Sequence, residues 1–278
     1  LDRFLTESIK ADDLPSHAAP WGSDHHQRLD RICDEEFALV ESRGLTGRPL
    51  LWQRDGGRLR RALQEFLFHD DERRSKDLLT PVAAEMAFGF DGNKPLVLRL
   101  ADGRTLRFRG RIDRVDRAVG GGLVVTDFKT GKKQHYNKIN EDSPDVDGQY
   151  LQLPLYGLAA RERLATPDTD VEVRYWFLTD GGKIVGHPLS DPVLGRFDHV
   201  LTTIIDGIEQ GLFPARPPKS SYGIGCDYCD PDDLGTKSRT NLWDRKRQDP
   251  RLDDYRRLIG DLFDDDPIAV IDLGGSDD

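Results

Sequence analysis

Two short stretches of this sequence carry two carboxylates and an ammonium group at spacings that suit metal-ion chemistry. The first reads Gly-Arg-Ile-Asp-Arg-Val-Asp at residues 110–116, and the second reads Leu-Val-Val-Thr-Asp-Phe-Lys-Thr-Gly at residues 123–131. Alternate side chains of a β-strand point to the same face, so we expect Asp127 and Lys129 to point together. A carboxylate on the preceding strand, Asp113, completes the minimum set for a hard cation and a positioned water. Metal-dependent phosphodiester cleavage is usually built in this way.

The spacing of apolar residues predicts the elements that position these groups. Three- and four-residue spacing predicts helices from residue 1 to about residue 79. From residue 80 the period changes to two, which predicts β-strands, with a hairpin turn at Asp102-Gly103. The expected strands span residues 82–90, 96–100, 105–115, 123–129 and 171–179. Helices are expected over residues 148–163 and 193–210, and a turn over residues 180–183.

The composition limits the class of protein. At 278 residues, 37% hydrophobic and 32% charged, the chain is long enough to bury a substantial core. No apolar run approaches the roughly 18 residues that a membrane-spanning helix needs, and no secretory signal is visible. Three cysteines argue against a disulfide framework and indicate a reducing compartment, so we expect a cytoplasmic protein. The chain begins at Leu1 and its only methionine is Met86, which indicates a piece of a longer protein.

The net charge of −10 predicts no strong non-specific attraction of the whole chain to nucleic acid. Many of the acidic residues lie in the tail from Asp261 to Asp278, and others are candidate metal ligands, so a local groove can still be positive. The basic residues that we expect to contact nucleic acid are Lys132, Lys133, Arg245, Lys246 and Arg247. The last three belong to a basic stretch with two interpretations: a solvated helix face paired with neighbouring aspartates, or a surface that contacts DNA.

The order of three motifs resembles one nuclease family. The motifs at residues 110–116 and 123–131, followed by Gln-Leu-Pro-Leu-Tyr at residues 152–156, are similar to the RecB-like branch of the PD-(D/E)XK nuclease superfamily. This branch includes the nuclease domains of the bacterial RecBCD, AddAB and AdnAB helicase–nucleases. The resemblance covers about residues 80–180. It implies an α/β fold with a restriction-endonuclease-like core, in which helices flank a central mixed β-sheet, with helical extensions at both ends.

We therefore expect one structural domain with three regions. Residues 1–79 form a helical N-terminal region, and residues 80–212 form the nuclease core. Residues 213–278 contain a Cys-x2-Cys loop, a basic helix and an acidic tail.

The resemblance also implies a set of metal ligands. By position, Asp113 and Asp127 would bind Mg²⁺ or Mn²⁺, and the carbonyl group of Phe128 would be a third ligand. Glu85, on an earlier strand, matches an upstream acidic position of the family and would supply a further oxygen. Lys129 would orient or help to activate the attacking water and offset charge in the transition state.

Two polar residues of the following helix complete the implied site. Gln152 and Tyr156 are four positions apart, so they share one helix face. The resemblance implies that they support the site and contact the region of the scissile phosphate. The catalytic set is therefore predicted to be Asp113, Asp127, Lys129, Gln152 and Tyr156.

The chain departs from the family pattern at its start. The family often has a histidine ligand just before a segment such as residues 1–5, and that position is not in this chain. His25 and His26 lie too far along the sequence to replace it. We expect them to be surface residues in a loop.

The cysteines depart from the pattern as well. Some relatives hold a [4Fe–4S] cluster with one early cysteine and a late Cys-x2-Cys-x5-Cys motif. Cys226 and Cys229 match the first late pair, but Gly235 occupies the next position. Because three cysteines cannot supply four thiolates, we predict that no intact cluster is bound. The third cysteine, Cys33, is expected to pack in a helix against the core.

The sequence thus predicts a Mg²⁺- or Mn²⁺-dependent DNA nuclease, an exonuclease that acts in DNA repair or DNA-end processing. The expected substrate is single-stranded DNA, supplied by a helicase on the same or a partner chain, because this chain contains no Walker loop. The alternative is a nuclease-fold module that binds DNA or a partner without cutting. The missing histidine favours this alternative, whereas Asp113, Asp127, Lys129 and Gln152 favour the enzyme.

Overall fold

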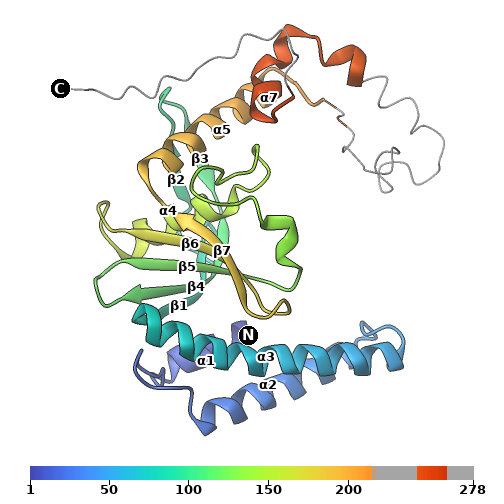
Figure 1. Ribbon diagram of the computed structural model, residues 1–278, viewed down its shortest axis with the longest axis vertical. Coiled ribbons are helices and arrows are strands. Elements are labelled where there is room, and N and C mark those ends of the chain that lie inside the picture. Colours follow the sequence, from blue (N-terminus) through green and yellow to red (C-terminus); the bar gives the residue numbers. More distant parts are fainter. Residues whose placement is uncertain (215, 217–242, 262–278) are drawn as a thin grey trace. The chain divides into compact units, whose positions relative to one another are not determined.

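The computed structural model describes residues 1–214, 216 and 243–261 and is shown in Figure 1. The chain divides into two compact units, Leu1–Asp198 and His199–Asp278, and each is described by itself. None of the helices in the described ranges is long and apolar enough to cross a membrane. The predicted regions 1–79, 80–212 and 213–278 stay predictions.

Three helices precede the first strand, as the three- and four-residue spacing predicts: α1 (Asp2–Lys10), α2 (Ser23–Ser42) and α3 (Pro49–Asp77). The third begins with a proline in its first turn, where the missing N–H group carries no cost, and ends at Leu78 in the left-handed conformation. Buried side chains recur on one side of each helix: Phe4 and Leu5 in α1, Leu29, Ile32 and Cys33 in α2, and Phe66 and Leu67 in α3. They form a cluster with Trp176 and Leu178 of the sheet region.

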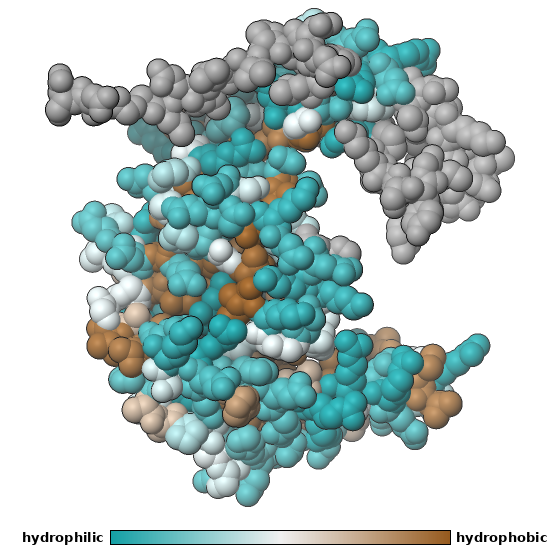
Figure 2. All heavy atoms as spheres, in the orientation of Figure 1, coloured by the Kyte–Doolittle hydropathy of each residue, from teal (hydrophilic) through white to brown (hydrophobic). Residues whose placement is uncertain are grey.

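Helices α2 and α3 form an antiparallel hairpin whose loop end reaches past the sheet (Figure 1). The hydrophobic residues of α2 and α3 in the cluster on the sheet lie at residues 29–33 of α2 and 63–67 of α3, away from the loop between the helices. Apolar side chains are exposed at the loop end (Figure 2), where Leu45 is 63% exposed and Leu50 is 78% exposed. The hairpin is therefore anchored to the sheet at one end only.

The central sheet has five strands in the order β1-β4-β5-β6-β7. Their bounds are β1 (Leu79–Phe88), β4 (Gly110–Ala118), β5 (Leu123–Lys129), β6 (Val171–Phe177) and β7 (Lys183–Pro188). Strands β5 and β6 are parallel and the other neighbours are antiparallel. The parallel pair needs a crossover, which contains helix α4 (Gln152–Leu164). This mixed sheet between helices confirms the predicted restriction-endonuclease-like α/β core.

The sheet is buried on both faces. Along β6, Val173, Tyr175 and Phe177 belong to a cluster with α4, whereas Trp176 belongs to the cluster with α1, α2 and α3. Gly157 lets α4 approach closely, since a Cβ atom there would lie 2.7 Å from Cγ1 of Val173. This contact fixes the height of α4 above the strands. Helix α5 (Asp191–Glu209) follows β7 and spans the boundary between the two units.

One expected strand, over residues 105–115, is two strands in different sheets. β3 (Thr105–Phe108) pairs with β2 (Leu96–Arg99) in a two-stranded ribbon, and β4 starts at Gly110. A Cβ atom at residue 110 would lie 2.6 Å from Cζ of Phe88, so the chain can enter the larger sheet there only as glycine. Exposed and less exposed residues alternate without interruption across Arg109. Periodicity alone therefore could not separate the two strands.

Candidate active site

The two motif carboxylates lie where neighbouring strands β4 and β5 separate. Asp127 of β5 is 3% exposed, and Asp113 of β4 is half-buried. The backbone N–H of Phe128 donates a hydrogen bond to Oδ2 of Asp113 at 2.7 Å. At this end of the two strands, the last backbone pairing joins Arg114 with Thr126. Beyond that pair, the side chain of Asp113 takes the place of a backbone acceptor, and this ties it to the strand that carries Asp127.

A chain of polar contacts joins Asp127 to helix α4. Nζ of Lys129 lies 2.5 Å from Oδ2 of Asp127 and donates a hydrogen bond to Oε1 of Gln152 at 3.1 Å. Nε2 of Gln152 in turn donates to the hydroxyl oxygen of Tyr156 at 3.0 Å. The ammonium also lies 4.9 Å from the ring centre of the buried Tyr175. Side chains from two strands and one helix thus hold a single ammonium beside a buried carboxylate.

Burial and like charge raise the pKa values of the carboxyl groups in this region. Burial is the main cause that raises the pKa of Asp127 to about 6, and the charge of Asp113 adds to the effect while Lys129 opposes it. The pKa of Asp113 is also raised, mainly by burial, although the hydrogen bond from Phe128 opposes this. A cation placed between these groups would favour their ionised forms.

Glu85 lies at the edge of this cluster on a distorted strand. Its backbone has a φ of 49°, which is rare for a residue with a side chain. Burial is the first cause that raises its pKa to about 7, followed by the charges of Asp2 and Asp113, while Arg111 lowers it. Nε of Arg111 lies 3.8 Å from Oε2 of Glu85. The structure therefore brings the predicted Glu85 into the same electrostatic region as Asp113.

Asp2 is an acidic neighbour of the site that sequence reasoning missed. Its charge contributes to the raised pKa values of both Glu85 and Asp113. Phe4 and Leu5 anchor helix α1 in the cluster that also includes Ala84, the residue before Glu85. Asp2 lies in the first turn of α1, and nothing local in the sequence indicates that this helix packs beside β1.

The carboxylates fit an open metal site rather than an enclosed one. Within residues 1–214, 216 and 243–261, no three His, Cys, Asp or Glu side chains are arranged to hold a metal ion. Mg²⁺ usually binds through one or two carboxylates and completes its shell with waters and substrate phosphates. Oδ2 of Asp127 is buried, and its contact with Lys129 lacks hydrogen-bond geometry, so this oxygen retains capacity as a ligand. Asp113 and Asp127 therefore fit Mg²⁺ or Mn²⁺.

The predicted nucleic-acid-binding residues fall in two places. Lys132 is exposed and Lys133 is half-buried, directly after β5, and the backbone N–H of Lys133 donates to Oδ2 of Asp180 at 3.0 Å. The other three, Arg245, Lys246 and Arg247, belong to the second compact unit. Nη2 of Arg247 lies 3.1 Å from Oδ1 of Asp261 in that unit. Contact of any of these residues with nucleic acid stays a prediction.

Two further residues of the first motif, Arg114 and Asp116, take part in a buried network of ion pairs. Arg114 is buried, and its guanidinium contacts Oδ1 of Asp70 on α3 and Oδ1 of Asp116, both at 2.7 Å. Oδ2 of Asp70 accepts hydrogen bonds from Trp21 at 2.8 Å and Arg74 at 2.9 Å. This buried network ties α3 to the strand that carries Asp113.

The expectation for the two adjacent histidines is wrong. His25 and His26 lie in the first turn of α2, not in a loop, and both are half-buried. Nδ1 of His25 accepts a hydrogen bond from the N–H of Gly22 at 3.1 Å, and its ring stacks edge-on against Trp21. Apolar periodicity did not predict that α2 begins before these residues, because the start of the helix carries polar side chains. Cys33 is buried in the helical cluster as predicted, whereas Cys226 and Cys229 lie outside the described residues.

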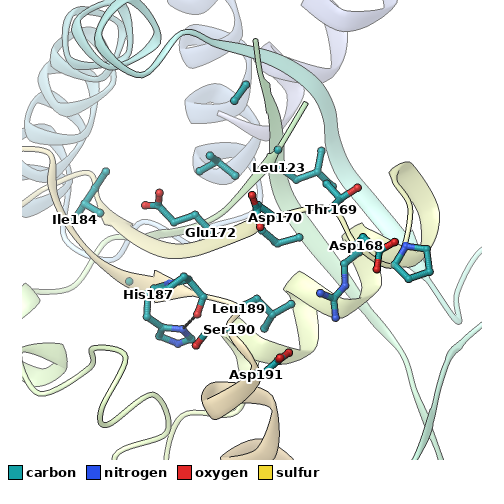
Figure 3. Close-up of a pocket in the computed structure, with 18 of the residues that line it drawn as sticks. Leu123, Asp168, Thr169, Asp170, Glu172, Ile184, His187, Leu189, Ser190 and Asp191 are labelled. Atoms are coloured by element: carbon teal, nitrogen blue, oxygen red, sulfur yellow. Dashed lines mark hydrogen bonds between the residues drawn. The ribbon is translucent and has the colours of Figure 1, made fainter. Parts of the chain in front are cut away.

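A separate cavity of about 1000 Å³ lies at the other end of the parallel strands (Figure 3). It is lined by the first residues of β5 and β6, including Leu123, and by Asp170, Glu172 and the buried His187. None of Asp113, Asp127 and Lys129 lines it. It is therefore not part of the carboxylate site.

The fold is of the restriction-endonuclease-like class, with a mixed five-stranded sheet between helices. The sequence profile of the PD-(D/E)XK nuclease superfamily matches residues 8–233, which is most of the chain. The chain belongs to this superfamily. Two curated relatives, both helicase–nuclease subunits, confirm the resemblance to the RecB-like branch.

Each of these relatives is described as a subunit of an ATP-dependent helicase/deoxyribonuclease. The protein from Pelotomaculum thermopropionicum is 33% identical over 144 residues, which cover 48% of this chain and 12% of the relative. The protein from Clostridium acetobutylicum is 26% identical over 212 residues, which cover 70% of this chain and 16% of the relative. The chain thus spans only a small part of the length of these relatives.

Proposed function

We propose that this chain is a divalent-metal-dependent DNA nuclease that hydrolyses phosphodiester bonds in DNA repair or DNA-end processing. The observation that carries the proposal is the continuous contact from Asp127 through Lys129 to Gln152, beside Asp113. A solvated strand face would leave these side chains separate and exposed. Here the carboxylate of Asp127 is buried, and the ammonium of Lys129 is held between it and α4. Burial of these charged groups costs desolvation free energy, which is typical of functional sites.

Each residue has a role in this proposal. Asp113 and Asp127 hold Mg²⁺ or Mn²⁺, with the carbonyl of Phe128 and the carboxylate of Glu85 as further candidate ligands. When bound, the ion polarises the phosphate and lowers the pKa of a bound water. Lys129 holds the water and offsets the negative charge that develops on the phosphate oxygens.

The two helix residues position that lysine. Oε1 of Gln152 accepts a hydrogen bond from Nζ of Lys129, so the ammonium is held toward the first turn of α4. The hydroxyl of Tyr156 accepts from Gln152, and its own proton therefore remains available to a phosphate oxygen. Burial raises the pKa of Tyr156, so the phenol keeps that proton at neutral pH.

The relatives support the substrate and the partner in this proposal. Their descriptions name a deoxyribonuclease and a helicase together, which favours a DNA substrate and a helicase as partner. We propose exonuclease action on single-stranded DNA that the motor supplies. A catalytically inactive module that binds DNA or a partner is the second candidate.

Cleavage assays with labelled single- and double-stranded DNA test the proposal. The protein is incubated with Mg²⁺, Mn²⁺ or a chelator, beside Asp127→Ala and Lys129→Ala. Matched controls are Asp168→Ala and Lys76→Ala, which remove exposed side chains elsewhere. We expect metal-dependent cleavage that both site variants lose and both controls keep. Unchanged cleavage in the site variants would overturn the assigned site, and DNA binding without cleavage in any metal would support the inactive module.

A further inference from the structure

The β2–β3 ribbon presents one apolar face and one polar face. Val97 lies opposite Arg107, and Arg99 lies opposite Thr105. These four residues are exposed, and Val97 is 50% exposed, while Leu96, Leu98 and Phe108 pack on the main core. Side chains opposite each other point to the same side of a ribbon, so the two arginines share the solvent face. They are diagonal neighbours, with Cα atoms about 7–8 Å apart.

Among the described residues, these two arginines have no acidic partner. In the part of the chain that the structure describes, the guanidinium of neither Arg99 nor Arg107 forms a hydrogen bond or an ion pair. The nearby acidic residues are used elsewhere: Asp102 pairs with Arg104 at 2.6 Å, and Asp198 accepts from the backbone of Ala101. Two uncompensated positive charges on one small face are unusual in a chain of net charge −10.

The row of arginines continues toward the candidate active site. Exposed positions alternate along the chain through Arg107, Arg109 and Arg111. The guanidinium of Arg109 lies 5.0 Å from the ring centre of Phe90, which is 38% exposed. Arg111 pairs with Asp91 at 2.8 Å and lies 3.8 Å from Glu85. The row therefore runs from a free basic face, past an arginine–aromatic pair, to the edge of the carboxylate cluster.

From this arrangement we infer that the ribbon face bearing Arg99 and Arg107, together with Arg109 and Phe90, binds the backbone of single-stranded DNA on its way to the carboxylates. Guanidinium groups match phosphate oxygens in geometry and charge. An exposed aromatic ring beside an arginine offers a surface on which an unpaired base can stack, and bases of a duplex are not available for this. The inference rests on the proposed function for its substrate, and it adds the path that the strand takes.

Binding and cleavage are measured separately, so that the two proposals can fail independently. A fluorescent oligothymidylate is titrated by anisotropy in chelator, with the full chain and a range of salt concentrations. Arg99→Ala/Arg107→Ala is compared with Arg43→Ala/Arg58→Ala, which removes two exposed arginines of the helical hairpin. The ribbon variant is expected to raise Kd about tenfold and to reduce the slope of log K against log salt by about 1.4. The control variant is expected to match the wild type.

A charge-retaining variant guards against a folding defect. Arg99→Lys/Arg107→Lys is expected to restore most of the salt slope, and all variants are expected to unfold at the wild-type temperature. Equal single-strand affinity of the wild type and the ribbon variant, or no binding by either, would overturn the inference even if cleavage depends on Asp127. A loss confined to duplex DNA or to an acidic peptide would overturn it too, because the face would then serve another partner.

Discussion

Nζ of Lys129 lies 3.1 Å from Oε1 of Gln152, so an amide in the first turn of α4 holds the ammonium that extends from the end of β5. The same ammonium contacts Oδ2 of Asp127 at 2.5 Å. If the Gln152 amide were absent, Asp127 would be the remaining partner of these two, and the ammonium could rotate toward its carboxylate. We therefore propose Gln152 as a positioning residue for Lys129.

Replacement of Gln152 is expected to slow cleavage and to leave DNA and metal binding intact. Gln152→Leu removes the acceptor for Lys129 at similar size, and misplacement of a catalytic group by about 1 Å costs about 100-fold in rate. Single-turnover cleavage at saturating protein measures this loss. Gln149→Leu, at an exposed residue just before the helix, is the control. Wild-type rates in Gln152→Leu would remove this residue from the site.

The raised pKa of Glu85 predicts a pH-dependent stability in the metal-free protein. The folded state holds the proton with a pKa of about 7, against an ordinary value of 4.5. A carboxyl group with a raised pKa makes its full contribution to the free energy of unfolding below its ordinary pKa. This contribution is lost as the pH rises through about 7. Glu85→Gln is therefore expected to stabilise the protein by about 3 kcal/mol near pH 8 and by less than about 1 kcal/mol near pH 5.

Urea unfolding in chelator at both pH values measures the effect of Glu85→Gln. Glu65→Gln, at an exposed glutamate of α3, is the control and should change the free energy of unfolding at neither pH. An equal change at the two pH values would show that burial does not raise the pKa of Glu85.

Local periodicity explains which parts of the site could be predicted from the sequence. Asp127 and Lys129 are alternate residues of one strand, and Gln152 and Tyr156 are one helical turn apart, so their shared faces follow from backbone geometry alone. The approach of Asp2 could not be predicted, because it depends on how α1 packs against β1. The left-handed backbone of Glu85 could not be predicted either, because glutamate disfavours this conformation and only the folded strand pair imposes it.

The fold shows the same division between local and long-range information. Four strands of the sheet, β1, β4, β5 and β6, and the helices on both sides follow from changes of period along the chain. The edge strand β7, after the expected turn at residues 180–183, was not predicted. The transfer of the chain from the ribbon to the main sheet at Arg109 depends on the contact between Gly110 and Phe88, which are distant in sequence. The sequence does not single out Arg99 and Arg107, because their proposed role depends on the absence of ion-pair partners among the residues that the structure describes.

The close approach of α4 to β6 predicts a steric effect at one glycine. Gly157→Ala would place Cβ 2.7 Å from Cγ1 of Val173 and 3.1 Å from Cδ2 of Leu189. The overpacking is expected to reduce the free energy of unfolding by about 1–3 kcal/mol. Gly195→Ala in α5 meets no atom within 4 Å and is expected to raise stability by up to about 1 kcal/mol. Chemical denaturation of both variants tests the contrast, and equal effects would contradict the packing.

The buried network at Asp70 predicts a large loss of stability. Asp70→Ala leaves Arg114 and Arg74 buried with less compensating charge, which is expected to cost about 3–5 kcal/mol. Asp55→Ala breaks an exposed contact with Arg54 and should change stability by less than about 1 kcal/mol. Thermal and urea unfolding distinguish the two. A small effect of Asp70→Ala would mean that the network contributes little to holding α3 against β4.

Our proposal for Lys129 is that, beside Asp113 and Asp127, it makes this chain a metal-dependent nuclease. Its most direct test is single-turnover cleavage of labelled single-stranded DNA by Lys129→Met, measured together with the Mn²⁺ affinity of the same preparation. The variant keeps both carboxylates and removes the ammonium that competes for Asp127. We expect Mn²⁺ affinity at or above that of the wild type and cleavage slowed by about 100-fold or more. Cleavage at the wild-type rate, with metal bound, would contradict the claim.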